Sequence, residues 1–114
     1  MLFVVRFTDK PGTQALRAEF MDAHLAWVRD NSSWILLAGA LREAPEAVAV
    51  GGLWVVEALS REAAQEKLES DPFWAHGLRA GVDIYLWGMA TPDMNDLGHA
   101  LAEHYTRKHS FKTL

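Results

Sequence analysis

Apolar side chains recur with two different spacings in the first half of the chain. Residues 2–8 alternate and are rich in Val and Phe, which predicts a β-strand that ends in a turn of Asp, Lys, Pro and Gly. Over residues 14–29 the apolar positions recur every three or four residues, which predicts one face of a helix. Two further apolar runs, 34–41 and 48–58, are typical of strands, and we expect them to pair in antiparallel fashion.

The second half of the chain predicts a helix, a short helical turn and a final strand. Ser60 is a good N-cap for a helix over residues 60–70. Because proline suits the first position of a helix, Asp71 is expected to cap a short helical turn that starts at Pro72. Residues 81–89 alternate between apolar and polar again, and this pattern predicts the last strand.

The predicted order β-α-β-β-α-β is the split βαβ arrangement of an α+β, ferredoxin-like sheet with both helices on one face. In the first strand, Phe3, Val5 and Phe7 share one face, and Val4, Arg6 and Thr8 share the other. The later strands are likewise apolar on both sides. A sheet face with this much exposed apolar surface marks an interface or a pocket. We therefore expect a homodimer or a higher homo-oligomer in which two sheets face each other.

Size and composition exclude several classes of protein. The 114 residues fit one domain and a polar tail from residue 91, in which residues 94–106 predict a helix. A net charge of -4 and the absence of a long Lys/Arg cluster argue against nucleic acid as a partner. The chain has no cysteine, so neither disulfides nor thiolate catalysis is expected, and the cytoplasm is the expected location. No apolar run is long enough to predict a membrane span.

His24 and Asp71 are the two candidates for catalysis. His24 lies on the apolar stripe of the first predicted helix, although a core histidine satisfied by one hydrogen bond explains this position as well. Asp71 is explained as an N-cap, but one carboxylate oxygen can cap while the other accepts from a ring N–H. Together they could form a dyad in which the carboxylate fixes the imidazole tautomer and the free ring nitrogen moves a proton. Because no G-x-S-x-G motif is present, proton transfer fits better than acyl transfer.

The candidate substrate-binding residues are aromatic or follow Asp71 closely: Trp27, Trp54, Phe73, Trp74 and His76. The tryptophans could form walls for a flat substrate, but packing in a core or a dimer interface also explains them. His76 is explained equally well by a helix C-terminus. We expect no metal site and no cofactor: His99 and Glu103 are the one pair with metal-compatible spacing, and two ligands are too few.

The order and spacing of several short segments resemble the YciI-like (YCII-related) family over roughly residues 1–90. The matching segments are Leu2-Phe3-Val4-Val5 with Thr8-Asp9-Lys10, His24-Leu25-Ala26-Trp27-Val28, Leu36-Leu37-Ala38-Gly39, Gly51-Gly52-Leu53-Trp54-Val55-Val56-Glu57, and Ser70-Asp71-Pro72-Phe73 followed by Gly77-Leu78. The resemblance implies a dimeric α+β barrel and a pocket in which His24 and Asp71 form the catalytic dyad. It also implies a domain over residues 1–90, and we expect the extension 91–114 to pack on the partner subunit or the pocket.

The resemblance suggests a lyase-type dehydrochlorination of chlorinated hydroxyhydroquinones, and similar folds host lactone isomerases and cofactor-free monooxygenases. We therefore expect a small cofactor-independent lyase or isomerase in which His24, oriented by Asp71, abstracts a proton from a small molecule of the aromatic, quinol or enol type. The alternative is a non-catalytic dimeric module that binds a small ligand or assists another enzyme. In that case the two side chains would form only a structural hydrogen bond.

Overall fold

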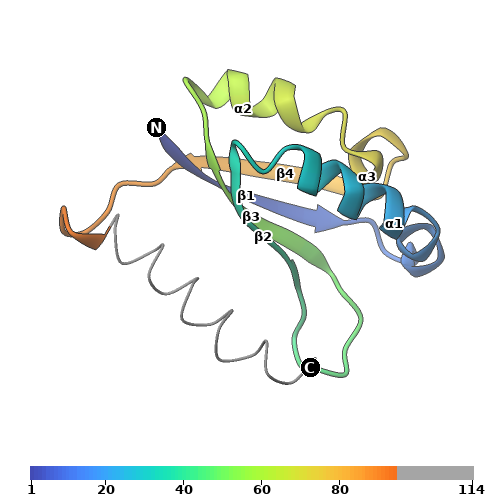
Figure 1. Ribbon diagram of the computed structural model, residues 1–114. Coiled ribbons are helices and arrows are strands. Elements are labelled where there is room, and N and C mark those ends of the chain that lie inside the picture. The colour runs from blue at the N-terminus through green and yellow to red at the C-terminus, as the bar shows by residue number, and fades with distance from the viewer. Residues whose placement is uncertain (95–114) are drawn as a thin grey trace, which may run out of the picture.

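A computed structural model of the chain describes residues 1–94 as a four-stranded antiparallel sheet with helices on one face (Figure 1). The elements are β1 (Leu2–Asp9), α1 (Gln14–Asp30), β2 (Ile35–Leu41), β3 (Gly51–Glu57), α2 (Arg61–Leu68), α3 (Pro72–Ala75) and β4 (Arg79–Leu86). The predicted α+β, ferredoxin-like order is confirmed. The helix expected over residues 94–106 and the pair of His99 and Glu103 lie outside the described residues.

The strand order is β2-β3-β1-β4, so β1 lies inside the sheet and pairs with β3 on one side and β4 on the other. Pairing with β1 sets where its neighbours begin and end. The strand predicted over residues 48–58 is shorter, because its pairing with β1 starts at Gly51, opposite Thr8. The strand predicted over residues 81–89 begins earlier, at Arg79, which pairs with Asp9 across an irregularity in the register.

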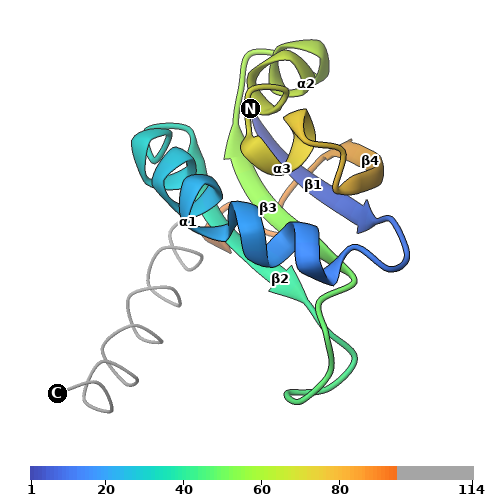
Figure 2. The ribbon, with the colours of Figure 1, turned by 90° about the vertical axis from the view of Figure 1, so that its right-hand side faces the viewer.

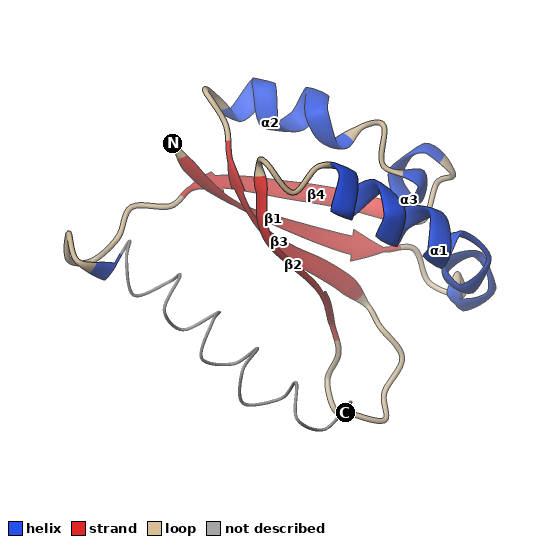
Figure 3. Ribbon diagram, in the orientation of Figure 1, coloured by secondary structure: helices blue, strands red, loops and turns tan. Residues whose placement is uncertain are grey.

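Helices α1, α2 and α3 cover the same face of the sheet (Figures 2 and 3). In Figure 2, α1 runs over β2 and β3, while α2 and α3 lie over the other half of the sheet. The core lies between these layers and contains alternate residues of the strands together with apolar residues of α2: Phe3, Val5, Phe7, Ile35, Trp54, Val56, Ala64, Leu68 and Ile84. This burial follows the period of two that β-strands impose on their side chains.

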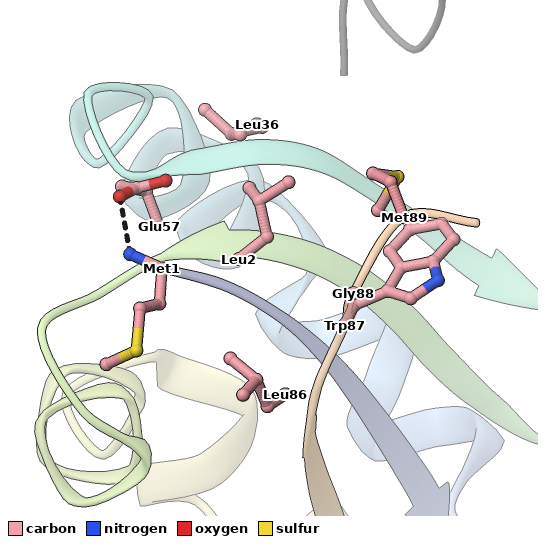
Figure 4. Close-up of a pocket in the computed structure, with 8 residues that line it drawn as sticks. All are labelled: Met1, Leu2, Leu36, Glu57, Leu86, Trp87, Gly88 and Met89. Atoms are coloured by element: carbon pink, nitrogen blue, oxygen red, sulfur yellow. Dashed lines mark hydrogen bonds and ion pairs between the residues drawn. The ribbon is translucent and has the colours of Figure 1, made fainter. Parts of the chain in front are cut away.

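The opposite face of the sheet is open and carries large apolar side chains. Leu37, Leu53 and Tyr85 are 49%, 40% and 59% exposed there. Beside the end of β4, this face also has a broad, shallow hollow of about 580 Å³ (Figure 4). The amino group of Met1 pairs with Glu57 at 2.8 Å at its edge.

Two predicted N-caps form as expected. The hydroxyl oxygen of Ser60 accepts a hydrogen bond from the backbone N–H of Ala63 at 3.0 Å, which starts α2. Asp71 Oδ1 accepts from the backbone N–H of Phe73 at 3.2 Å, with Pro72 at the first position of α3. These caps satisfy backbone donors that have no partner within their own helix.

Among residues 1–94, no helix combines the length and the apolar character that crossing a membrane requires.

Candidate active site

His24 and Asp71 meet between α1 and α3, although 47 positions separate them in the chain. His24 is the buried residue of α1, with 9% of the residue exposed, and Asp71 is completely buried at the N-cap of α3. His24 Nδ1 lies 2.7 Å from Asp71 Oδ1, which is the short distance of a charge-assisted hydrogen bond. The sequence could identify both residues, but only the packing of the two helices brings them into contact.

The hydrogen bonds that Asp71 accepts indicate which of the two side chains carries the proton between them. Oδ1 also accepts from the N–H of Phe73, so it acts as an acceptor, and His24 Nδ1 is the donor. In a neutral imidazole this leaves Nε2 without a proton. Nε2 has no hydrogen-bond partner among the described residues, and it is not among their fully buried unpartnered atoms, which are Asp71 Oδ2 and Arg79 Nε. The arrangement therefore leaves an accessible basic nitrogen on His24.

Aromatic side chains hold the imidazole in place. The ring of Phe73 stacks on that of His24 with 3.9 Å between the centroids and 10° between the planes. Trp54 lies on the sheet side, 6.3 Å from the imidazole centroid. Phe73 and Trp54 are each only 1% exposed, so packing limits the rotation of His24.

A cavity of about 200 Å³ lies beside His24, between α1 and the sheet. Its walls come from α1, β2, β3 and the start of β4, and include Trp54, Gly52, Met21 and Val28. The larger hollow of Figure 4 lies on the other face of the sheet and contains neither dyad residue among its walls. We therefore place the candidate site in the smaller cavity, because His24 of the buried dyad lines it together with Arg17 and Arg79.

Three charged residues next to this cavity form a network that sequence analysis did not identify. Asp9 Oδ1 accepts from Arg79 at 2.7 Å, and Asp9 Oδ2 accepts from Arg17 at 2.9 Å. Arg17 also donates to the carbonyl oxygen of Gly51 at 3.2 Å. Burial lowers the pKa of the Arg79 guanidinium, while the hydrogen bond and charge of Asp9 raise it. Both arginines line the cavity.

The irregular register of β4 explains why Arg79 escaped detection. Ile84 and Val82 pair with inward-facing residues of β1, so strict alternation would place Ala80 inward and Arg79 outward. The shift between Thr8 and Asp9 reverses this order, and Arg79 is 7% exposed. Asp9 and Arg17 carry no signal in the sequence, because they lie on different elements, β1 and α1, and only the packing of these elements brings them together.

The other expected binding residues have different positions relative to the cavity. Trp54 lines it, whereas Phe73 supports the imidazole from outside the lining. Trp27 donates its indole N–H to the hydroxyl of Ser70 at 3.1 Å and packs against Trp54, so its ring belongs to the core side of α1.

Trp74 and His76 lie elsewhere on α3. Trp74 packs against the hydrophobic core. His76 is the C-cap of α3 and stacks on Phe20, with centroids 3.8 Å apart. Neither is part of the cavity wall. Among residues 1–94, no group of three or more His, Asp or Glu side chains is arranged to hold a metal ion.

The comparisons with known proteins agree with this fold. The YCII-related domain matches residues 1–88 of the chain. The structure of 5-chloro-2-hydroxyhydroquinone dehydrochlorinase from Burkholderia phenoliruptrix AC1100, in complex with 2,5-dihydroxybenzoquinone, is similar with a TM-score of 0.71 and 28% identity. The similarity covers 79% of this chain and 96% of that protein. A comparison with curated proteins finds no match.

More distant structures share the general fold. SnoaB, a cofactor-independent oxygenase from Streptomyces nogalater, is 18% identical with a TM-score of 0.46, over 80% of this chain and 95% of that one. A putative antibiotic biosynthesis monooxygenase from Nitrosomonas europaea is 13% identical with a TM-score of 0.46, over 79% of this chain and 98% of that one.

Proposed function

The chain belongs to the YCII-related domain family, and from this membership we propose that it is a small cofactor-independent lyase or isomerase. Its substrate is a small molecule of the aromatic, quinol or enol type. The observation that carries the proposal is the hydrogen bond of 2.7 Å between His24 and Asp71 beside a cavity. A fixed imidazole with a free nitrogen at an open cavity is the arrangement that general base catalysis requires.

In this proposal His24 Nε2 takes a proton from a hydroxyl group or an activated carbon of the substrate. The electron pair of the broken bond moves into the adjacent ring or carbonyl group. Asp71 keeps the proton on Nδ1 and stabilises the imidazolium that forms, because its negative charge lies at hydrogen-bond distance. The proton then returns to another substrate atom in an isomerisation, or leaves with an anion in an elimination.

The size of the cavity supports a single-ring substrate. Its volume of about 200 Å³ exceeds the roughly 150 Å³ of an engineered protein cavity that accepts benzene. Trp54, which is 1% exposed, lies in the wall next to the imidazole, so a ring in the cavity would lie near His24.

The dehydrochlorinase supports an elimination on a quinol ring, because it shares 28% identity and almost its full length with this chain. For a chlorinated hydroxyhydroquinone the overall change is loss of HCl. One hydroxyl proton moves to the carbon that bears chlorine, and a second passes to Nε2. Both oxygens become carbonyl groups, and chloride leaves with the electron pair of the C–Cl bond.

Replacement of the base tests the proposal. Turnover of 5-chloro-2-hydroxyhydroquinone and of a set of enol lactones is measured by chloride release and by absorbance. We expect His24→Gln to lower kcat by about 10²–10⁴-fold, the usual contribution of a positioned general base. His76→Gln is the matched control, because His76 stacks on Phe20 away from the cavity.

Unchanged turnover by a folded His24→Gln protein would contradict the assignment of the base. If the wild-type protein bound these compounds without converting any, the non-catalytic alternative would replace the enzymatic proposal. Circular dichroism and thermal unfolding of each variant show whether its fold is intact.

We also propose that the protein is a homodimer that buries the open sheet face. The exposed side chains of Leu37, Leu53 and Tyr85 support this arrangement, because exposed apolar surface rimmed by polar groups, here the ion pair of Arg6 and Asp83, marks interaction sites. The hollow of Figure 4 lies on the same face and is mostly lined by apolar residues.

A further inference from the structure

Three arginines line the cavity beside the dyad. Arg17, Arg42 and Arg79 all contribute to its wall together with His24, and the wall, which lies within residues 1–94, includes no Asp or Glu. Arg17 and Arg79 share the carboxylate of Asp9, and the charge of Asp71 also acts on Arg79, so these two arginines and two carboxylates balance. Arg42 adds another positive charge at the more exposed side of the cavity.

The two inner arginines are close to the dyad. The guanidinium carbons of Arg17 and Arg79 lie 5.1 and 5.2 Å from the centroid of Phe73, whose ring stacks on His24. The chain also leaves space in front of Arg79. A Cβ atom at Gly52, which lines the same cavity, would lie 3.4 Å from the guanidinium, so glycine keeps this approach open.

Arg79 holds an unused hydrogen-bond donor. Its side chain is 3% exposed, and Nη1 donates to Asp9. Nη2 has no partner among the described residues and, unlike Nε, is not among their fully buried unpartnered atoms. Because Nη2 lies next to Gly52 in the cavity wall and N–H groups in native proteins nearly always have an acceptor, a ligand in the cavity can supply the acceptor for Nη2.

We infer that the cavity binds a ring compound with an ionised oxygen, a carboxylate or a ring enolate, and that Arg79 and Arg17 form its anion subsite. This inference rests on the proposed function and deepens it, because it defines the substrate class as anionic. The arginines would also stabilise the negative charge that develops on the ring when Nε2 removes a proton. A planar guanidinium is well suited to pair with such oxygens.

The test compares two probes of nearly equal shape, benzoate and benzamide, which differ in charge. Their dissociation constants are measured by NMR titration of the ¹⁵N-labelled full-length protein. We expect benzoate to bind at least about tenfold more tightly than benzamide, as charge-assisted hydrogen bonds are stronger than neutral ones. The Nε resonance of Arg79 should move on addition of benzoate and stay in place with benzamide.

Substitution of Arg79 tests whether the anion binds beside this residue. Arg79→Gln should reduce the affinity for benzoate about tenfold, to that for benzamide, whereas Arg79→Lys should keep part of the preference because it retains the charge. Arg29→Gln is the matched control, since Arg29 lies exposed in the last turn of α1 outside both hollows. If Arg79→Gln fails to fold because Asp9 loses its partner, the preference and the Nε shift of the wild-type protein decide the question.

Equal affinities for benzoate and benzamide, or an Nε resonance that benzoate leaves unmoved, would overturn the anion subsite. The proposed function fails in a different way, through unchanged turnover in the His24→Gln variant. We expect that variant to keep its preference for benzoate, so binding and catalysis can be judged separately.

Discussion

A single atom, Oδ1 of Asp71, links the fold of α3 to the chemistry of His24. It accepts both the capping N–H of Phe73 and the Nδ1–H of the imidazole. The second oxygen, Oδ2, is buried without a partner among the described residues. A carboxylate in this position is costly to bury, and the His24 bond offsets part of that cost. A buried carboxylate of this kind is expected at a site where the protein uses the negative charge of the residue.

Gly51 shows how closely β3 approaches β1. A Cβ atom at this position would collide with the backbone carbonyl oxygen of Phe7, so no side chain fits. We predict that Gly51→Ala lowers the free energy of unfolding by about 1–3 kcal/mol, as overpacking does in other cores. Gly81→Ala is the control, because a Cβ there meets nothing within 4 Å. Urea unfolding of both variants measures the difference, and equal stabilities would contradict the close approach.

At the scale of elements, the sequence patterns locate most of the helices and strands correctly. Apolar residues recur at every second position in β1 and at every third or fourth position in α1, and this change identifies the two elements. The caps at Ser60 and Asp71 mark the starts of α2 and α3. These signals are local, since they reflect the geometry of one element and its ends. His24 is also recognisable locally, because a polar residue interrupts an apolar stripe.

The side-chain positions that the sequence did not predict depend on contacts between elements. The register shift that turns Arg79 inward arises where β4 meets β1, and no pattern within β4 reveals it. The sequence also does not show whether Trp27 and Trp74 face a cavity or the core, because aromatic side chains occur in both places. The arginine-lined wall therefore became visible only in three dimensions.

At the scale of the whole molecule, the sheet separates two surfaces with different properties. The helix-covered face holds the dyad together with Arg17 and Arg79, whereas the other is open and carries large apolar side chains around the ion pair of Arg6 and Asp83. A stable dimer that uses this open face would bury about 1,600 Å² in total, the common size of a specific interface. The cavity beside His24 would remain on the side of the sheet away from the interface.

We predict that Leu37→Glu converts the dimer to a monomer, because a charge there would lose its water on association and its cross-strand neighbour on β3, Val55, provides no opposite charge. Leu59→Glu is the matched control: this leucine is 89% exposed in the loop before α2. Sedimentation velocity measures the oligomeric state of each protein. A wild-type protein that sediments as a monomer would contradict the predicted assembly.

The central claim is that His24 carries its proton on Nδ1 and offers a free Nε2 to a ring in the cavity. ¹⁵N NMR of histidine-labelled protein measures this directly, with the His24 signals assigned by their loss in His24→Gln. For the neutral ring we predict a protonated Nδ1, an unprotonated Nε2, and a shift of the Nε2 resonance when 2,5-dihydroxybenzoquinone is added. A ring protonated on Nε2, or an Nε2 resonance that the ligand leaves unchanged, would contradict the account.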